Sequence, residues 1–173
     1  ATGIPGFSFR GRQADPFIKP ERLTVAAAFD RFAGIDLLRT VAGREGDRAA
    51  LAEAARERVR ITDDDNWSDI FSKVLVEHIE PRLGQDRLTV LSDYPAPEAA
   101  LARISRADSR VAERFEIYAC GVELANGFGE LTDAAEQRAR FAQAMDEKQS
   151  RYGERYPLDE DFLAAVARMP EAG

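Results

Sequence analysis

The chain has 173 residues, of which 45% are hydrophobic, and a formal net charge of −7. This length and apolar content can bury one sizeable core, and no apolar run approaches the length of a membrane span. Lysine and arginine are scattered rather than gathered into stripes, which argues against direct nucleic-acid binding because phosphates require a clustered positive surface.

The first part of the chain predicts two helices after an irregular opening. Residues 1–20 are rich in glycine, proline and arginine and indicate an irregular segment. Thr24 can cap a helix that runs to about Phe32, because its hydroxyl can accept from a free backbone N–H group. Asp47 then begins an alanine-rich helix to about Arg60.

A third helix is expected over residues 66–82. The acidic run at 63–66 lacks the glycine and distal glutamate of an EF-hand, so we interpret it as the cap of this helix. His78 is the one histidine of the chain, and a structural role at the helix edge is favoured over general-base chemistry. Trp67 is interpreted as a packing anchor.

The second part predicts a strand, a hairpin and further helices. Residues 87–92 indicate a strand ended by prolines, and residues 98–104 a short helix. After the hairpin described next, Asp133 and Glu136 predict a capping box for a helix to about Tyr152. Leu158 begins a last helix, whose expected buried residues are Phe162, Leu163 and Val166.

Residues 114–131 read as two short strands that meet at a glycine turn, with three carboxylates among apolar residues: Glu116, Glu123 and Glu130. Burying an ionised carboxylate without a partner costs several kcal/mol. The pattern therefore favours a cation at this site, namely a divalent metal, an ammonium group or both. The alternative is a solvated acidic hairpin.

The register of this hairpin has two possible forms. If Ala119 and Cys120 form a two-residue turn, Glu116 lies directly opposite Glu123, and a magnesium ion would compensate their repulsion. A glycine bulge at Gly121 would shift the pairing by one residue. Cys120, the single cysteine, excludes a disulfide framework, favours a reducing, cytoplasmic compartment and is expected to be a surface thiol.

The same segment resembles a known family of enzymes. Arg114-Phe115-Glu116, a second glutamate seven residues later and the run from Ala125 to Arg138 are similar to the catalytic core of class II lysyl-tRNA synthetases. The preceding stretches 91–97, 100–105 and 110–116 are closer to their short paralogues, the elongation factor P–lysine ligases. The resemblance runs from about Glu21 to the C-terminus and is strongest over residues 88–141.

The resemblance implies a role for each residue at the nucleotide end of the site. Glu116 and Glu123 would hold the Mg²⁺ ions that bridge the phosphates of ATP, with Leu124 beside the nucleotide. Positioning and charge neutralisation would supply most of the rate, so the protein would need no nucleophile of its own.

The resemblance also implies an amino-acid pocket. Asn126, Gly127 and Phe128 would line it, and Glu130 would face the cationic amine of lysine or β-lysine, which discriminates against neutral side chains. The implied reaction is formation of an aminoacyl-adenylate, followed by transfer to a lysine of elongation factor P. The implied fold is α+β, an antiparallel sheet flanked by helices, and the family commonly dimerises.

Two parts of the family pattern are missing from residues 1–173. An arginine-bearing motif is expected upstream and a glycine-rich motif ending in a second arginine downstream. We therefore interpret the chain as one partial catalytic domain that should not activate an amino acid alone. A lysyl-tRNA synthetase core fragment and a non-catalytic binding remnant are the alternatives.

Overall fold

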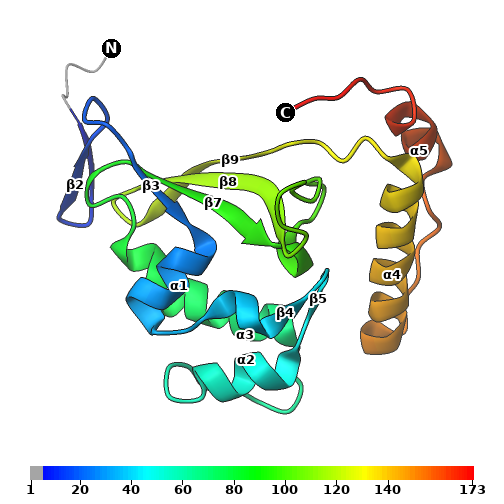
Figure 1. Cartoon of the computed structure of the whole chain (residues 1–173), viewed down its shortest axis with the longest axis horizontal. Coiled ribbons are helices and arrows are strands. Elements are labelled where there is room, and N and C mark those ends of the chain that lie inside the picture. The colour runs from blue at the N-terminus through cyan, green and yellow to red at the C-terminus, as the bar shows by residue number, and fades with distance from the viewer. Residues whose placement is uncertain (1–5) are drawn as a thin grey trace. The chain divides into compact units, whose positions relative to one another are not determined.

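Residues 6–173 are described by a computed structural model, in which the chain divides into two units (Figure 1). The first unit comprises the chain up to Ala100 together with Ile104–Gly127, and the second comprises Leu101–Arg103 and Phe128–Gly173. Each unit is described by itself. Within the described residues, no helix is long and apolar enough to cross a membrane.

The first unit begins with a small sheet of three strands, β1 (Phe7–Phe9), β2 (Arg12–Asp15) and β6 (Asp86–Arg87), in the order β1-β2-β6. The turn between β1 and β2 has positive φ at both Arg10 and Gly11, 48° and 79°, which suits a tight hairpin. The expectation of an irregular opening is therefore wrong for residues 7–15, since two strands and their turn lie there. Its first five residues fall outside the described part of the chain.

The main sheet has the order β3-β7-β8-β9. Its strands are β3 (Glu21–Thr24), β7 (Thr89–Pro95), β8 (Val111–Ala119) and β9 (Val122–Phe128). β7 and β8 pair antiparallel, whereas β3 pairs parallel with β7. Figure 1 shows α1 and α3 on one side of this sheet. The expected mixture of helices around a sheet is confirmed, with one parallel pair added.

The helices of the first unit begin where the capping residues predict. The N-cap side chains of Thr24, Asp47 and Asn66 each accept from a backbone N–H group of the following turn. The helical segments are α1 (Val25–Ala33), a 3₁₀ turn (Leu37–Thr40), α2 (Arg48–Ala55), α3 (Trp67–Val74), a π-helical turn (Leu75–Ile79) and a 3₁₀ turn (Glu80–Arg82). Two short strands, β4 (Val41–Ala42) and β5 (Glu45–Gly46), form a separate ladder.

The core of the first unit lies between the sheet and these helices. Phe71 stacks on Phe29 and on Trp67, with ring centroids 5.0 and 5.3 Å away. The Trp67 indole N–H donates to the Thr40 hydroxyl at 3.1 Å, so Trp67 is the packing anchor that was expected. The Nε2 atom of His78 lies 2.8 Å from the carbonyl oxygen of Arg58, which fits the structural role expected for this histidine.

The segment after β7 differs from its prediction. The expected helix over residues 98–104 is absent, and a single 3₁₀ turn (Ala96–Glu98) stands in its place. Ala100 has a φ of 50°, which a right-handed helix cannot include. Ala102 and Ile104 instead form isolated β-bridges with Glu130 and Ala112 respectively.

The second unit contains the helices α4 (Ala134–Tyr152) and α5 (Glu160–Val166). Asp133 caps α4 as predicted, since its carboxylate accepts from the backbone N–H groups of Ala135 and Glu136. Leu163 and Val166 are buried as expected. Phe162 is 39% exposed, so its predicted burial is wrong, although its ring contacts that of Phe141.

Candidate functional site

The turn between β8 and β9 sets the register of the acidic hairpin. Cys120 and Gly121 both have positive φ, 56° and 75°, which is the signature of a two-residue type I′ turn. Such a turn pairs Ala119 with Val122. Of the two registers considered, the one with a turn at Ala119–Cys120 is therefore wrong, and by this turn type Tyr118, rather than Glu116, pairs with Glu123.

Glu116 is nevertheless the centre of a hydrogen-bond cluster. Its side chain is only 6% exposed. Arg114 Nη2 donates to Glu116 Oε1 at 2.8 Å, and Asn126 Nδ2 donates to the same oxygen at 3.2 Å. The Tyr118 hydroxyl donates to Oε2 at 2.6 Å. These charge-assisted bonds offset the cost of burying the carboxylate, so Glu116 is a buried and partnered acid.

Arg114 is itself fixed on three sides. Besides Glu116, it donates from Nη1 to the carbonyl oxygen of Glu98 at 2.9 Å, and its guanidinium lies 4.4 Å from the centroid of the Tyr94 ring. The Tyr94 hydroxyl is buried and lies close enough to Glu116 to interact with it, but it forms no hydrogen bond of normal geometry among the described residues. Burial chiefly raises the pKa of Tyr94, so this hydroxyl stays protonated.

Glu80 joins this cluster from outside the hairpin. The Tyr118 hydroxyl lies 3.4 Å from Glu80 Oε1. Burial chiefly raises the pKa of Glu80, and the charges of Glu116 and Glu123 add to the rise, whereas the nearby Tyr118 hydroxyl, which shares its one proton mainly with Glu116, opposes it. Sequence reasoning missed this residue, because nothing in its local pattern distinguishes it from a solvated helical glutamate.

The nucleotide end of the predicted site lies at the exposed edge of the sheet. Glu123 is exposed, and its carboxylate has no hydrogen bond or ion pair within residues 6–173. Partial burial raises the pKa of Glu123 and the Glu116 charge adds to this, while the Arg114 charge lowers it. Leu124 beside it is 47% exposed. This edge therefore presents an unpaired carboxylate next to a buried one.

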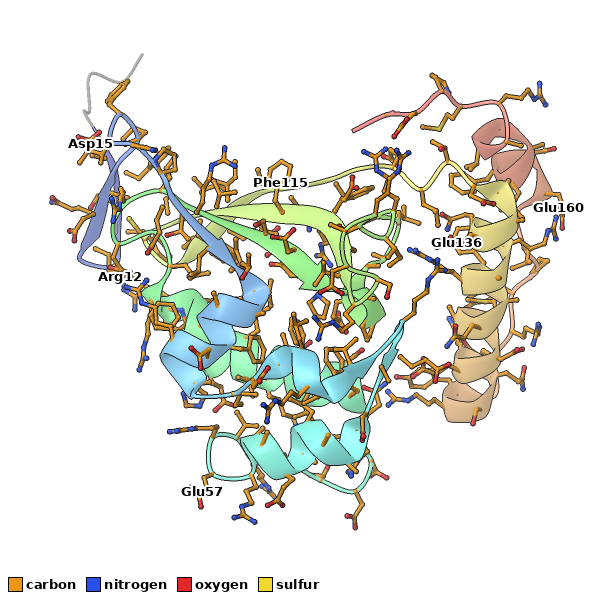
Figure 2. The ribbon with its side chains drawn as sticks, viewed as in Figure 1. Arg12, Asp15, Glu57, Phe115, Glu136 and Glu160 are labelled. Atoms are coloured by element: carbon orange, nitrogen blue, oxygen red, sulfur yellow. The ribbon has the colours of Figure 1, made fainter. Side chains whose placement is uncertain are left out.

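Gly127 allows a close approach within the hairpin. A Cβ atom at this position would lie 2.7 Å from Cζ of Phe115, which is closer than van der Waals contact permits. Phe115 projects from the face of the sheet opposite to α1 (Figure 2) and is 40% exposed. The glycine therefore leaves room for the Phe115 ring of the neighbouring strand.

Phe128 and Glu130 belong to the second unit and are both half-buried. The Glu130 backbone N–H donates to the Ala172 carbonyl at 2.9 Å, and Glu130 forms a β-bridge with Ala102. Their predicted contacts with an amino-acid substrate remain predictions.

The donor set suits an ion that arrives with a nucleotide. Among residues 6–173, no group of three or more histidine, cysteine, aspartate or glutamate side chains is arranged to hold a metal. Mg²⁺ commonly binds one or two carboxylates together with substrate phosphates and waters. The exposed carboxylate of Glu123, beside the partly committed carboxylate of Glu116, fits that arrangement.

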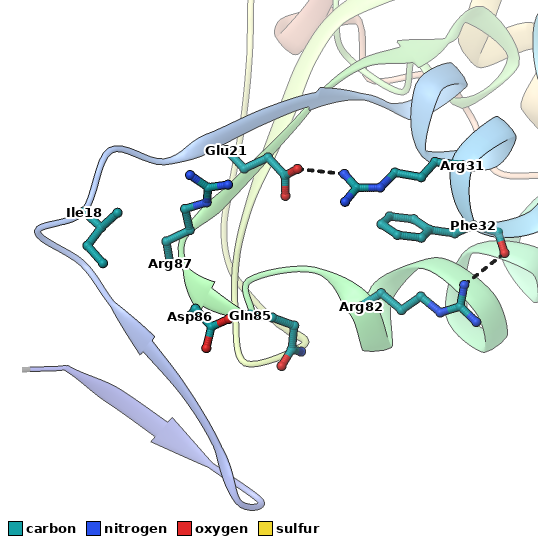
Figure 3. Close-up of a pocket in the computed structure, with 8 residues that line it drawn as sticks. All are labelled: Ile18, Glu21, Arg31, Phe32, Arg82, Gln85, Asp86 and Arg87. Atoms are coloured by element: carbon teal, nitrogen blue, oxygen red, sulfur yellow. Dashed lines mark hydrogen bonds and ion pairs between the residues drawn. The ribbon is translucent and has the colours of Figure 1, made fainter.

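A separate cavity of about 440 Å³ contains none of the predicted site residues (Figure 3). Glu21 forms an ion pair with Arg31 at 2.8 Å, and Arg82 donates to the Phe32 carbonyl at 3.2 Å. Two of its charged groups thus pair with each other, and a third bonds to a backbone carbonyl. The full lining comprises Ile18, Glu21, Arg31, Phe32, Arg82, Gln85, Asp86 and Arg87.

Comparison with known proteins gives consistent matches. Residues 18–173 match the family of class II tRNA synthetases (D, K and N). The elongation factor P–(R)-β-lysine ligase of Klebsiella pneumoniae is 42% identical over 155 residues, 87% of this chain and 46% of that protein. The ligase of the same name from Pectobacterium atrosepticum is 41% identical over 156 residues, which are 87% of this chain and 46% of that protein. The one from Haemophilus influenzae is 40% identical over 154 residues, which are 88% of this chain and 46% of that protein. The chain therefore spans about half the length of the curated relatives it matches.

Proposed function

This chain belongs to the class II tRNA synthetases of the D, K and N type, and we propose that it is part of a ligase that activates lysine or β-lysine with ATP. In this proposal the activated amino acid passes to a lysine of elongation factor P. The relatives named as ligases of elongation factor P and (R)-β-lysine support this choice of substrates. We place the reaction in the cytoplasm, in a homodimer, with no direct nucleic-acid binding.

The proposed chemistry divides the hairpin into two ends. Glu123 and Glu116 would hold Mg²⁺ on the phosphates of ATP, beside Leu124. Asn126, Gly127 and Phe128 would line the amino-acid pocket, and Glu130 would pair with the substrate ammonium group. The bound ion would supply charge neutralisation at the phosphates.

The reaction itself needs no nucleophile from the protein. The carboxylate of the amino acid attacks the α-phosphate of ATP, which forms the aminoacyl-adenylate and releases pyrophosphate. The side-chain amine of a lysine on elongation factor P then attacks the activated carbonyl and releases AMP. The chain's residues would orient these groups and stabilise their charges, which accounts for most of the rate in such transfers.

One observation carries this proposal most directly. Glu116 is buried and held by Arg114, Tyr118 and Asn126, while the neighbouring Glu123 is exposed and unpaired within the described residues. A solvated acidic hairpin would not hold one of its carboxylates in a built cluster. A fixed acid beside a free one is the arrangement that a cationic guest requires.

The experiment is ATP–pyrophosphate exchange by the full-length protein that contains this chain, with lysine and with (R)-β-lysine. We expect exchange that depends on the amino acid and falls at least about 100-fold in Glu123→Gln. Glu57→Gln, a change at another exposed glutamate (Figure 2), is the matched control and should leave exchange intact. Exchange that Glu123→Gln leaves unchanged would remove the metal role.

Two further arms separate the alternatives. Transfer of the activated amino acid to elongation factor P, but not to tRNA, supports the ligase, whereas transfer to tRNA supports a lysyl-tRNA synthetase core, which the D, K and N family also includes. Amino-acid binding without exchange would indicate a non-catalytic remnant. The same assay on residues 1–173 tests whether this chain is inactive alone.

A further inference from the structure

The hydrogen bonds to Glu116 limit how it can bind an ion. A carboxylate offers about four in-plane lone-pair positions, two on each oxygen. Arg114 and Asn126 both donate to Oε1, at 2.8 and 3.2 Å, which uses the two positions of that oxygen. The Tyr118 hydroxyl uses one position of Oε2, at 2.6 Å. These three donors leave one position, on Oε2, and the nearby Tyr94 hydroxyl, which interacts with Glu116, forms no hydrogen bond of normal geometry to it.

Tyr118 is well placed to fix that remaining position. Its side chain is 1% exposed and belongs to the hydrophobic core of the first unit, so the ring cannot swing away without disturbing the packing. The hydroxyl is the donor in the bond to Glu116 Oε2. The core thus determines where this hydroxyl lies, and the hydroxyl determines how Oε2 is turned.

The same cluster sets the polarity that Asn126 presents. Its Nδ2 group is committed to Glu116 Oε1, whereas Asn126 itself is exposed. One N–H of this group and the amide oxygen are left for an incoming molecule, and the oxygen accepts hydrogen bonds from a donor such as an ammonium group. Fixing Glu116 consequently fixes two features of the site at once.

We propose that Tyr118 is a positioning residue, which holds Glu116 so that a single Oε2 lone pair faces the Mg²⁺ carried by the nucleotide. Glu116 would then offer one oxygen to that ion, and Glu123 would be the freer ligand. Arg114 supports the same geometry from the Oε1 side. This inference rests on the proposed function and names a residue that the resemblance does not assign.

The first test compares Tyr118→Phe with Tyr156→Phe in the full-length protein. Each change removes one hydroxyl that donates to a glutamate, since the exposed Tyr156 donates to Glu154 at 3.1 Å. Loss of an outer partner of a metal ligand typically weakens metal binding about 10- to 100-fold. We expect the Mg²⁺ concentration for half-maximal exchange to rise about tenfold or more in Tyr118→Phe only.

A structural role would give a different result. If Tyr118 only stabilised the fold, exchange would fall at every Mg²⁺ concentration and its half-saturation point would stay unchanged. An unchanged Mg²⁺ half-saturation point overturns the proposal.

The second test needs no activity. In residues 1–173, the side-chain amide resonances of Asn126 report its bond to Glu116, so ¹H–¹⁵N spectra should show them moved in Tyr118→Phe and unmoved in Tyr156→Phe. Arg114→Lys, which keeps the charge and loses the forked geometry, should move them as well. If Tyr118→Phe fails to fold, the Arg114→Lys spectrum still tests whether the hydrogen bonds to Glu116 fix the position of Asn126. Resonances that stay in place in these variants also overturn the proposal.

The two tests separate the two claims. If the wild-type protein shows no exchange with lysine or β-lysine, the proposed function fails, and the spectra still decide whether Tyr118 orients Glu116. If the wild-type protein exchanges but Tyr118→Phe keeps the normal Mg²⁺ dependence, the positioning role fails alone.

Discussion

The guanidinium of Arg114 lies over the ring of Tyr94, 4.4 Å from its centroid, and at the same time pairs with Glu116 at 2.8 Å. Arginine can do both because its planar head stacks on an aromatic face while its edge donates hydrogen bonds. This contact connects β7 to the carboxylate on β8. The acid at the centre of the candidate site is therefore held by the main sheet.

Removing Arg114 should be severely destabilising. Arg114→Met leaves Glu116 buried with its ion-pair partner gone, and breaking a buried pair from one side costs about 3–5 kcal/mol. Urea unfolding of residues 1–173 measures this loss. Arg22→Met, at an exposed position, should cost little, and adding Glu116→Gln to Arg114→Met should recover part of the stability. Equal losses in the free energy of unfolding for Arg114→Met and Arg22→Met would contradict a stabilising role of the Arg114–Glu116 ion pair.

Gly127→Ala should destabilise the hairpin through a single contact. The new Cβ atom would meet the Phe115 ring at 2.7 Å, and overpacking of this kind costs about 1–3 kcal/mol. Phe115→Leu should relieve most of the clash, so the double variant should be more stable than the sum of the two single changes predicts. Strictly additive losses in thermal or urea unfolding would show that the ring is not the obstacle.

Glu80 should make stability depend on pH in an unusual direction. Burial raises its pKa in the folded state, so the folded chain binds a proton more readily than the unfolded chain. The loss of folding stability caused by ionised Glu80 is complete above the raised pKa, and it fades as the pH falls toward the ordinary pKa of glutamate.

Glu80→Gln should therefore stabilise the chain at pH 7, by no more than about 1 kcal/mol once solvent screening is allowed for, and much less near pH 4. Unfolding curves at both values measure the difference. The exposed neighbour Glu77, changed to Gln, is the control and should show no such pH dependence. A loss of stability in Glu80→Gln at pH 7 would refute the sign.

Cys120 should react slowly with thiol reagents in the folded chain. It is 2% exposed and packs with Ala14, Ala119 and Leu88, which corrects the expectation of a surface thiol. Labelling by a disulfide reagent should be roughly a hundredfold slower in buffer than in denaturing urea, because it requires local opening of the turn. Comparable rates in both solutions would mean that the turn opens freely.

Short-range features of this fold could be predicted from the sequence. Thr24, Asp47, Asn66 and Asp133 all cap helices as expected, because a cap depends on a side chain and the backbone two or three residues later. The end of α2 was placed too late, at about Arg60 rather than Ala55. No glycine or proline marks that end, so the local pattern carried no signal for it.

Long-range features could not be predicted in the same way. The pairing of β3 with β7 and the approach of Glu80 to Tyr118 both join residues far apart in the chain. The hairpin lies within reach of local reasoning, but the register that makes the two glutamates face each other puts the turn one residue early, because a non-glycine residue with positive φ at Cys120 is uncommon. That shift replaced the expected facing glutamates by a glutamate facing a tyrosine.

The widened π turn at Leu75–Ile79 determines where the carboxylate of Glu80 lies relative to the hairpin. Such a turn accommodates one residue more than an α-helical turn, so it delays the rotation of everything that follows by about 100°. With this delay, Ile79 is fully buried and Glu80 reaches the tyrosine hydroxyl. Deleting the exposed Val76 would restore the regular α-helical winding and turn Glu80 away from Tyr118. The rotational phase of this helix therefore decides whether the carboxylate of Glu80 approaches those of Glu116 and Glu123.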